Sequence, residues 1–286
     1  MSEPTVRRRR LGSELRRLRE EVHGLRVEDV VAKSTTGLNS SKISRIENAT
    51  VGVKVASLDE LLDLYGVDDV ERRAALHGLA RDGARRGWWQ SYRDVISPAY
   101  ADLISLESDA KSMRSYQTTL IPGLLQTSAY ARATISAINM SDTAERVEQL
   151  VQVRQARQSV LTRPNPLELW AIVHESALHT RLPDKSVMRD QLQRLLDLQE
   201  LPTVTIQVLP LVAPPHPGMA GAFTVLGFPE TADLDVVHVE SLTSALYVED
   251  LAEVSVYGSG FERLRASSLP FDESADLIAR LKDKIT

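Results

Sequence analysis

The first third of the chain alternates apolar stripes with short polar stretches, a pattern typical of a small bundle of helices. One stripe has spacings of four, three and four residues, which follow the period of an α-helix: Leu11, Leu15, Leu18 and Val22. Gly24 ends this helix. Three arginines lie outside the stripe, where we expect solvent or phosphate to meet them: Arg16, Arg17 and Arg19.

A second short helix is predicted where Val27, Val30 and Val31 face inward. Glu28 and Asp29 lie near its amino-terminal end, where the helix dipole favours carboxylates. Residues 34–39 are rich in Ser, Thr, Gly and Asn and therefore predict a turn.

The third predicted helix, residues 40–48, is apolar only along a narrow seam. Asn39 or Ser40 caps it, and Ile43 and Ile46 form the seam. Such a helix is poorly explained as a core element, but it suits the DNA major groove, which admits an α-helix. The alternative is a polar helical hairpin that binds no DNA.

Leu58, Leu61, Leu62 and Tyr65 predict a fourth helix, and residues 69–82 predict a fifth. The whole arrangement resembles the Cro/XRE-type helix-turn-helix domain. Many members of that family show the pattern Ser-x-x-Ile-Ser-Arg-Ile-Glu, which Ser40 and residues 43–47 match. The resemblance implies a set of residues that face DNA: Ser40, Ser41, Lys42, Ser44 and Arg45.

Within that set, Arg45 would fork to a guanine or hold a phosphate, while Lys42 and the serines would touch bases or backbone. Glu47 would orient a neighbouring arginine, because phosphate would repel it. Family members often begin the second helix with Thr-Gln-Glu, whereas this chain has Arg26 followed by Val and Glu. Arg26 and Arg16 are therefore candidate contacts to the DNA backbone.

Basic residues are concentrated at the start of the chain. Residues 1–50 contain 11 Lys and Arg against 7 Asp and Glu, whereas residues 91–286 contain 17 against 25. A basic head on an acidic body is typical of a DNA-binding module joined to another domain, although chance clustering would also produce it. The arginine run at residues 7–10 has two interpretations, an arm that reaches into DNA or a solvated helix start.

The length of 286 residues favours two domains, and 43% hydrophobic residues suffice for a large core. The chain has no cysteine, which excludes disulfides and thiolate sites and suits a reducing cytoplasm. Residues 201–229 carry no charge, but they contain six prolines, so they predict strand, loop and strand instead of a membrane span. We therefore expect a cytoplasmic protein with no membrane segment.

Residues 84–92 are predicted to be a hinge between a DNA-binding domain at 1–83 and a second domain at 93–286. Trp88, Trp89 and Tyr92 stand together there, in a chain with only 5% aromatic residues. We expect them to dock the last helix of the head onto the body. The alternative is that they stack on a ligand.

The second domain mixes alternating apolar stretches with helical ones and is predicted to be an α+β domain. The expected strands are residues 112–117, 167–173, 204–208, 223–228, 236–239 and 245–248. The expected helices cover residues 127–138, 142–162, 188–199, 250–266 and 272–284.

The order of five segments resembles an actinobacterial regulator family that includes WhiJ-like and antitoxin-like proteins: RRGWWQSY, LIPGLLQTSAYARA, TVTIQVLPL, GAFTVLGFP and VVHVESLTSALYVED. The resemblance implies an XRE-type head joined to a second domain of undefined biochemistry. It also implies transcriptional control and a small partner protein, often encoded next to the regulator, that antagonises it through the second domain.

No cluster in the second domain predicts catalysis, a cofactor or a metal. His174 and His179 are five residues apart, whereas a zinc helix needs histidines four residues apart. The uncharged loop at 213–222 is either a lid over the sheet or a rigid proline-rich connection. As a lid it would bring His216 near His174 and Glu175 at a strand end, which makes these three residues a candidate ligand or partner site.

The sequence thus predicts a transcription factor that binds double-stranded DNA and is not an enzyme. A homodimer is expected, since one short helix reads only a few base pairs. The alternative is an antitoxin-like module whose main role is to sequester a small protein.

Overall fold

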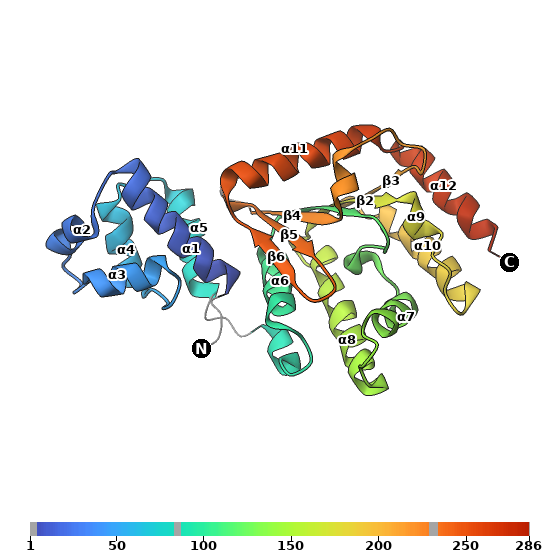
Figure 1. Cartoon of the computed structure of the whole chain (residues 1–286), viewed down its shortest axis with the longest axis horizontal. Helices are drawn as coiled ribbons and strands as arrows, with labels where there is room; N and C mark the ends of the chain where they lie inside the picture. Colours follow the sequence, from blue (N-terminus) through green and yellow to red (C-terminus); the bar gives the residue numbers. More distant parts are fainter. Residues whose placement is uncertain (1–4, 83–86, 229–233, 286) are drawn as a thin grey trace. The chain divides into compact units, whose positions relative to one another are not determined.

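The structure is a computed structural model that describes residues 5–82, 87–228 and 234–285. It divides into two compact units (Figure 1). Among the described residues, the first comprises residues 5–82, 87 and 234, and the second comprises residues 88–228 and 235–285. Part of the predicted hinge, residues 84–86, lies outside the described residues.

The first unit contains the five predicted helices. They are α1 (Val6–Arg17), α2 (Val27–Lys33), α3 (Ser40–Glu47), α4 (Val55–Leu64) and α5 (Val70–Asp82). A π-helical turn, Leu18–Val22, extends α1, and Gly24 follows it with a φ of +59°. The helix therefore ends where the sequence predicted.

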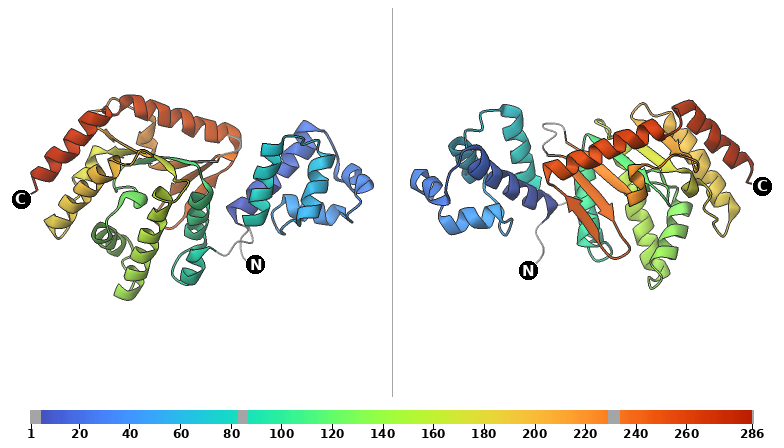
Figure 2. Two further views of the ribbon diagram at one scale, coloured as in Figure 1. Left: turned by 180° about the vertical axis from the view of Figure 1, so that it is seen from behind. Right: turned by 45° about the horizontal axis from the view of Figure 1, so that its top comes forward.

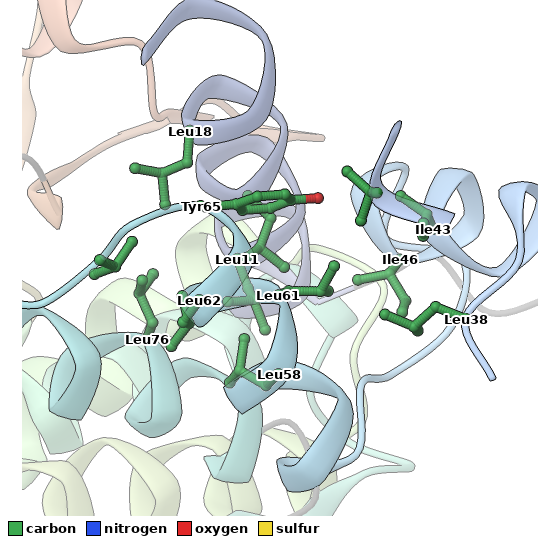
Figure 3. Packing of buried hydrophobic residues seen from close by; sticks show 13 residues of the cluster. Leu11, Leu18, Leu38, Ile43, Ile46, Leu58, Leu61, Leu62, Tyr65 and Leu76 are labelled. Carbon is green, nitrogen blue, oxygen red and sulfur yellow. The ribbon is translucent and has the colours of Figure 1, made fainter. Parts of the chain in front are cut away.

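Leucines of α1 and α4, the two isoleucines of α3 and Tyr65 make the core of the first unit (Figure 3). Leu11, Leu15 and Leu18 are buried as predicted, but Val22 is 52% exposed. The π-turn explains the error, because its i→i+5 hydrogen bond from His23 N to Leu18 O adds a residue to the turn and rotates Val22 off the stripe.

Gly12 allows α1 to approach the end of α3. A Cβ atom at this position would lie 2.7 Å from the carbonyl oxygen of Ile46 and closer still to that of Glu47. Backbone cannot yield as a flexible side chain would, so the two helices can pack this closely only with glycine at residue 12.

The second unit is built on a six-stranded sheet in the order β3-β2-β1-β4-β5-β6. The strands are β1 (Ser112–Gln117), β2 (Glu168–His174), β3 (Val204–Leu209), β4 (Phe223–Gly227), β5 (Val236–Glu240) and β6 (Ala245–Val248). β1, β2 and β3 are parallel, whereas β4, β5 and β6 continue the sheet in antiparallel pairs. Each predicted strand is present.

Helices connect the parallel strands and cover the sheet: α6 (Pro98–Asp109), α7 (Ser128–Ile138), α8 (Ala144–Arg157), α9 (Glu175–Leu178), α10 (Lys185–Gln199), α11 (Leu251–Ser267) and α12 (Phe271–Asp283). Figures 1 and 2 show α11 running across one face of the sheet, with α6, α7 and α8 on the other. Phe261 and Leu264 of α11 are buried against Tyr116, Phe223 and Val225. The prediction of a helical head followed by an α+β domain is confirmed. Within the described residues, no helix is long and apolar enough to span a bilayer.

Candidate nucleic-acid interface and a cavity in the second unit

Helix α3 begins at the cap that the sequence predicted. The side chain of Asn39 accepts a hydrogen bond from the backbone N of Lys42 at 2.8 Å, which satisfies an otherwise free amide of the first turn. Ile43 and Ile46 are 0% and 2% exposed, so the predicted seam anchors the helix to the core. Helices α2 and α3, with the turn between them, form a helix-turn-helix.

The outer face of α3 is polar and accessible. Ser40, Ser41, Ser44 and Arg45 are exposed, and the Arg45 side chain makes no hydrogen bond with the part of the chain that the structure describes. Lys42 is half-buried, with its Nζ 3.4 Å from the hydroxyl of Ser57. Four of the five predicted contact residues therefore present their side chains outward, and Lys42 lies at the edge of the same face.

Glu60 of α4 holds the turn that precedes α3. Its carboxylate accepts hydrogen bonds from the hydroxyl of Ser34 at 3.0 Å, from the backbone N of Thr36 at 3.0 Å, and from both the backbone N and the hydroxyl of Thr35. Desolvation raises the pKa of Glu60, but the bonds from Thr36 and Thr35 outweigh it and lower the pKa to about 2. No local sequence pattern indicates this residue, because 24 positions separate it from Thr36.

Arg19 lies inside the first unit, and the prediction that it faces solvent or phosphate is wrong. It is 4% exposed, and its Nε and Nη2 donate to the two carboxylate oxygens of Glu47, each at 2.7 Å. These hydrogen bonds raise the pKa of Arg19 despite its burial. The prediction that Glu47 orients a neighbouring arginine is confirmed. The pair connects the last residue of α3 to the end of α1.

The other basic residues of the head lie on its surface or at the start of α1. Arg16 is exposed and pairs with Glu20 at 3.2 Å, and Arg26 is exposed at the amino-terminal end of α2. The arginine run at residues 7–10 lies at the start of α1, which agrees with the interpretation of a helix start. Arg7 and Arg10, however, are buried instead of solvated.

A cavity of about 340 Å³ lies where the three parallel strands of the second unit end. Parallel strands present their carboxyl ends at the same edge, so the segments that follow β1, β2 and β3 meet there. They supply most of the wall, together with the loop that leads to β4: Thr118, Thr119, His174, Ser176, Pro210, Leu211, Ala213, Pro214, His216, Gly218 and Met219. Tyr116 of β1 completes it.

The structure places His174 and His216 in the wall of this cavity. His174 Nδ1 lies 2.7 Å from the hydroxyl of Ser176, and burial, together with the charge that His216 would carry, lowers the pKa of His174. Glu175 does not line the cavity. Its carboxylate accepts a hydrogen bond from the backbone N of Leu211 at 2.9 Å and lies 3.4 Å from His179 Nε2, so it secures the start of the loop.

Tyr116 and Gly218 are wall residues that were not predicted from the sequence. A Cβ atom on Gly218 would lie 2.6–2.8 Å from the phenol carbon and oxygen of Tyr116, so the loop backbone rests directly on this ring. The contact joins residues more than 100 positions apart, and no local pattern in the sequence indicates it.

Trp88 and Trp89 do not line the cavity. They lie in a 3-10 turn, Trp88–Tyr92, with their rings edge to face at 6.0 Å. Trp89 and Tyr92 pack against a cluster of Ile96, Ile104 and Val153 in the second unit, whereas Trp88 is 38% exposed. The docking of the head by these aromatics stays a prediction.

Within the described ranges, no three His, Cys, Asp or Glu side chains are grouped to hold a metal. Residues 10–75 match a family model described as a helix-turn-helix domain, and residues 100–280 match one described as a domain of unknown function (DUF5753). No curated protein and no solved structure matches the chain. The first match supports a DNA-binding regulator in preference to an enzyme.

Proposed function

Because the chain belongs to the family of the domain of unknown function DUF5753, here preceded by a helix-turn-helix domain, we propose that it is a sequence-specific DNA-binding transcriptional regulator. The first unit reads the operator with α3. The second unit receives a signal, either a small ligand or a partner protein, that changes the occupancy of the operator.

The outer face of α3 is the observation that carries this proposal. A helix that buries only Ile43 and Ile46 and leaves its serines and Arg45 exposed offers hydrogen-bonding groups to base edges without disturbing the core. Arg45 is assigned to a guanine or a phosphate, and Ser40, Ser41, Lys42 and Ser44 to neighbouring bases and backbone. Arg16 and Arg26 are assigned to phosphates on either side.

A dimer follows from the length of α3. Its eight residues span about 12 Å, which reaches only a few base pairs of the groove. Two copies related by a twofold axis would read two half-sites about one helical turn apart and double the recognised sequence.

Footprinting on the DNA upstream of its own gene tests the proposal. Arg45→Ala is expected to weaken binding by about 1–3 kcal/mol and, if Arg45 reads a base, to relax specificity at one position. Lys42→Ala, if Lys42 holds a phosphate, weakens all sequences alike and lowers the salt dependence. Arg189→Ala in α10 removes an exposed arginine of the second unit and is the matched control. An unchanged footprint with both head variants would refute the assignment of α3.

A second candidate function is sequestration of a small protein, as in the antitoxin-like regulators that the chain resembles. Strand β6 ends the sheet among the described residues, and its Leu246 and the preceding Leu242 are 59% and 76% exposed. An open apolar edge is suited to pairing with a strand of another protein. Tight capture of the product of a neighbouring gene, together with weak binding to all DNA sequences, would favour this function over the first.

A further inference from the structure

The cavity at the ends of β1, β2 and β3 has the position and size of a small-molecule site. In sheets with parallel strands, ligands bind beyond the carboxyl ends of the strands, where loops diverge and backbone groups are free to contact a ligand. Its volume of about 340 Å³ lies within the range of about 300–1,000 Å³ that small-molecule sites occupy.

His216 leaves an unmet hydrogen bond in this wall. Its Nδ1 is buried and has no partner among the described residues, although a buried polar atom without one destabilises a protein by about 1–3 kcal/mol. The polar groups opposite are already engaged with each other. The hydroxyl of Ser176 lies 2.6 Å from the carbonyl oxygen of Thr118 and 2.7 Å from His174 Nδ1. The wall also carries the imidazole ring of His216 and the hydroxyls of Thr118 and Thr119.

The wall carries no Lys, Arg, Asp or Glu side chain. The adjacent carboxylate, Glu175, is committed to the backbone N of Leu211 and to His179. Burial and the neighbouring imidazole lower the pKa of His174, so at neutral pH it supplies no positive charge for an anion. Because an unpaired charge is costly to bury, a wall without Lys, Arg, Asp or Glu disfavours a charged ligand.

The loop over the cavity is held in place, and apolar side chains surround its mouth. Gly218 rests on Tyr116, and Pro217 Cβ lies 3.6 Å from the position of a Cβ on Gly260 of α11. Leu211 and Met219 are 56% and 74% exposed beside the opening, and Val212 is 91% exposed next to them. An apolar body seated there would remove part of this surface from water.

We infer that the cavity binds a small uncharged organic molecule with an apolar body and one hydroxyl or amide group. Such a molecule covers the apolar part of the wall and places its polar group on the side of the wall that carries His174, His216 and Thr118. Its role as the signal that controls DNA occupancy rests on the proposed function, whereas its binding does not.

Three families of probes with the same apolar bodies test the charge preference on the full-length protein. These are aryl and alkyl alcohols, such as naphthalenemethanol, and the matching carboxylates and amines, each titrated by calorimetry and ligand-detected NMR. Alcohols are expected to bind at least about tenfold more tightly than either charged counterpart. The absence of binding by every alcohol, or equal binding by the carboxylates or amines, would overturn the inference.

Two substitutions locate the binding. Met219→Trp is expected to fold, because residue 219 is exposed. It is expected to abolish alcohol binding, because the larger side chain closes the mouth of the cavity. Met140→Trp, at a residue that is 86% exposed, is its control. His216→Phe keeps a ring but removes both ring nitrogens from the wall, and is expected to weaken binding about 2–10-fold, with recovery in His216→Asn. Alcohol affinity that neither Met219→Trp nor His216→Phe changes would place the probe elsewhere and refute the site.

Footprinting with and without the bound alcohol separates this inference from the proposed function. If an alcohol binds and Met219→Trp abolishes its binding, the inferred site is supported even when the protein occupies no operator. In that case only the proposed function is refuted. Operator binding without binding of any alcohol has the opposite meaning. It supports the proposed function and refutes the inferred ligand class.

Discussion

Each unit buries an arginine–glutamate pair, but the two pairs connect different things. In the first unit, Arg19 and Glu47 are 5% and 6% exposed and connect α1 to the last residue of α3, two positions beyond Arg45. In the second unit, Arg157 and Glu107 are 6% and 1% exposed and connect α8 to α6, with the Tyr100 hydroxyl 2.7 Å from Arg157 Nη1.

A buried arginine–glutamate pair has a different role in each unit. The Arg157–Glu107 pair joins two helices of the framework and does not line the cavity. The Arg19–Glu47 pair joins the framework to the helix that we assign to DNA. Since a charge left alone in a core is strongly destabilising, both pairs hold their helices firmly, but only the Arg19–Glu47 pair should also affect DNA recognition.

The largest effect is expected from removing one partner of each pair. Glu107→Ala should lower the free energy of unfolding of the second unit by about 3–5 kcal/mol, because it leaves the buried guanidinium of Arg157 without its carboxylate. Glu47→Ala should lower that of the first unit by less, because Arg19 keeps its ion pair with Glu20 at 2.9 Å and its hydrogen bond to the carbonyl oxygen of Leu25. All three tryptophans, Trp88, Trp89 and Trp170, belong to the second unit, so their fluorescence follows its unfolding. Hydrogen exchange at core amides such as Leu15 follows the first.

Only Glu47→Ala should also weaken operator binding in a footprint. Glu148→Ala, which breaks the exposed pair with Arg132, is the control and should change stability by less than about 1 kcal/mol. Equal loss of DNA affinity in the Glu47 and Glu107 variants would contradict the contrast between the two pairs.

A second effect, confined to the second unit, is expected from pH. Burial, aided by the charge of Arg157, lowers the pKa of His238 from 6.5 to about 4, so the folded state keeps this imidazole neutral while the unfolded state takes up a proton. Stability is therefore complete above pH 6.5 and is lost as the pH falls toward 4, by up to about 3 kcal/mol.

Urea unfolding followed by tryptophan fluorescence at several pH values measures this slope. His238→Phe should flatten it across the same interval, because the group that takes up the proton is gone. A slope that persists unchanged in that variant would show that another group controls the acid sensitivity of the second unit.

A third effect distinguishes two glycines of the first unit, Gly12 and Gly78. Gly12→Ala should lower its free energy of unfolding by about 1–3 kcal/mol, because the added methyl group meets the carbonyls of Ile46 and Glu47. It should also weaken DNA binding, since α3 must shift. At Gly78 of α5 a Cβ meets nothing within 4 Å, so Gly78→Ala should instead stabilise the helix by about 0.5–1 kcal/mol. Hydrogen exchange reports both, and destabilisation by both alanines would contradict the close approach.

The smallest effect is expected at the turn before α3. Glu60→Gln removes the negative charge that gathers hydrogen bonds from Thr35 and Thr36, and should destabilise the first unit by about 0.5–1.5 kcal/mol at neutral pH. Because the pKa of Glu60 is lowered from 4.5 to about 2, the contribution of its charge is present above pH 4.5 and is lost as the pH falls toward 2. Hydrogen exchange of the turn amides at pH 7 and pH 3 measures it, and identical protection in variant and wild type at both values would contradict this role.

Features that depend on near neighbours could be predicted from the sequence. The cap at Asn39, the buried Ile43 and Ile46 and the polar outer face follow from the period of a single helix. The strands were predictable for a similar reason, because alternation of apolar residues is a local signal. His174 and His216 were placed together from the ends of two elements and the composition of one loop.

Features that depend on distant partners could not be predicted. Arg19 looks like any solvent-facing arginine until Glu47, 28 positions away, is brought beside it. Val22 fits the apolar stripe, and only the π-turn moves it into solvent. The cavity requires the tertiary contact between Gly218 and Tyr116, which no periodicity encodes.

The placement of the cavity wall also affects how this family can diversify. Most of the wall comes from residues that follow β1, β2 and β3, beyond the last paired positions of the sheet. Replacing those residues therefore leaves the hydrogen bonds between strands intact. For the ligand inferred above, substitutions in the wall would therefore change which molecule binds while the scaffold stays the same.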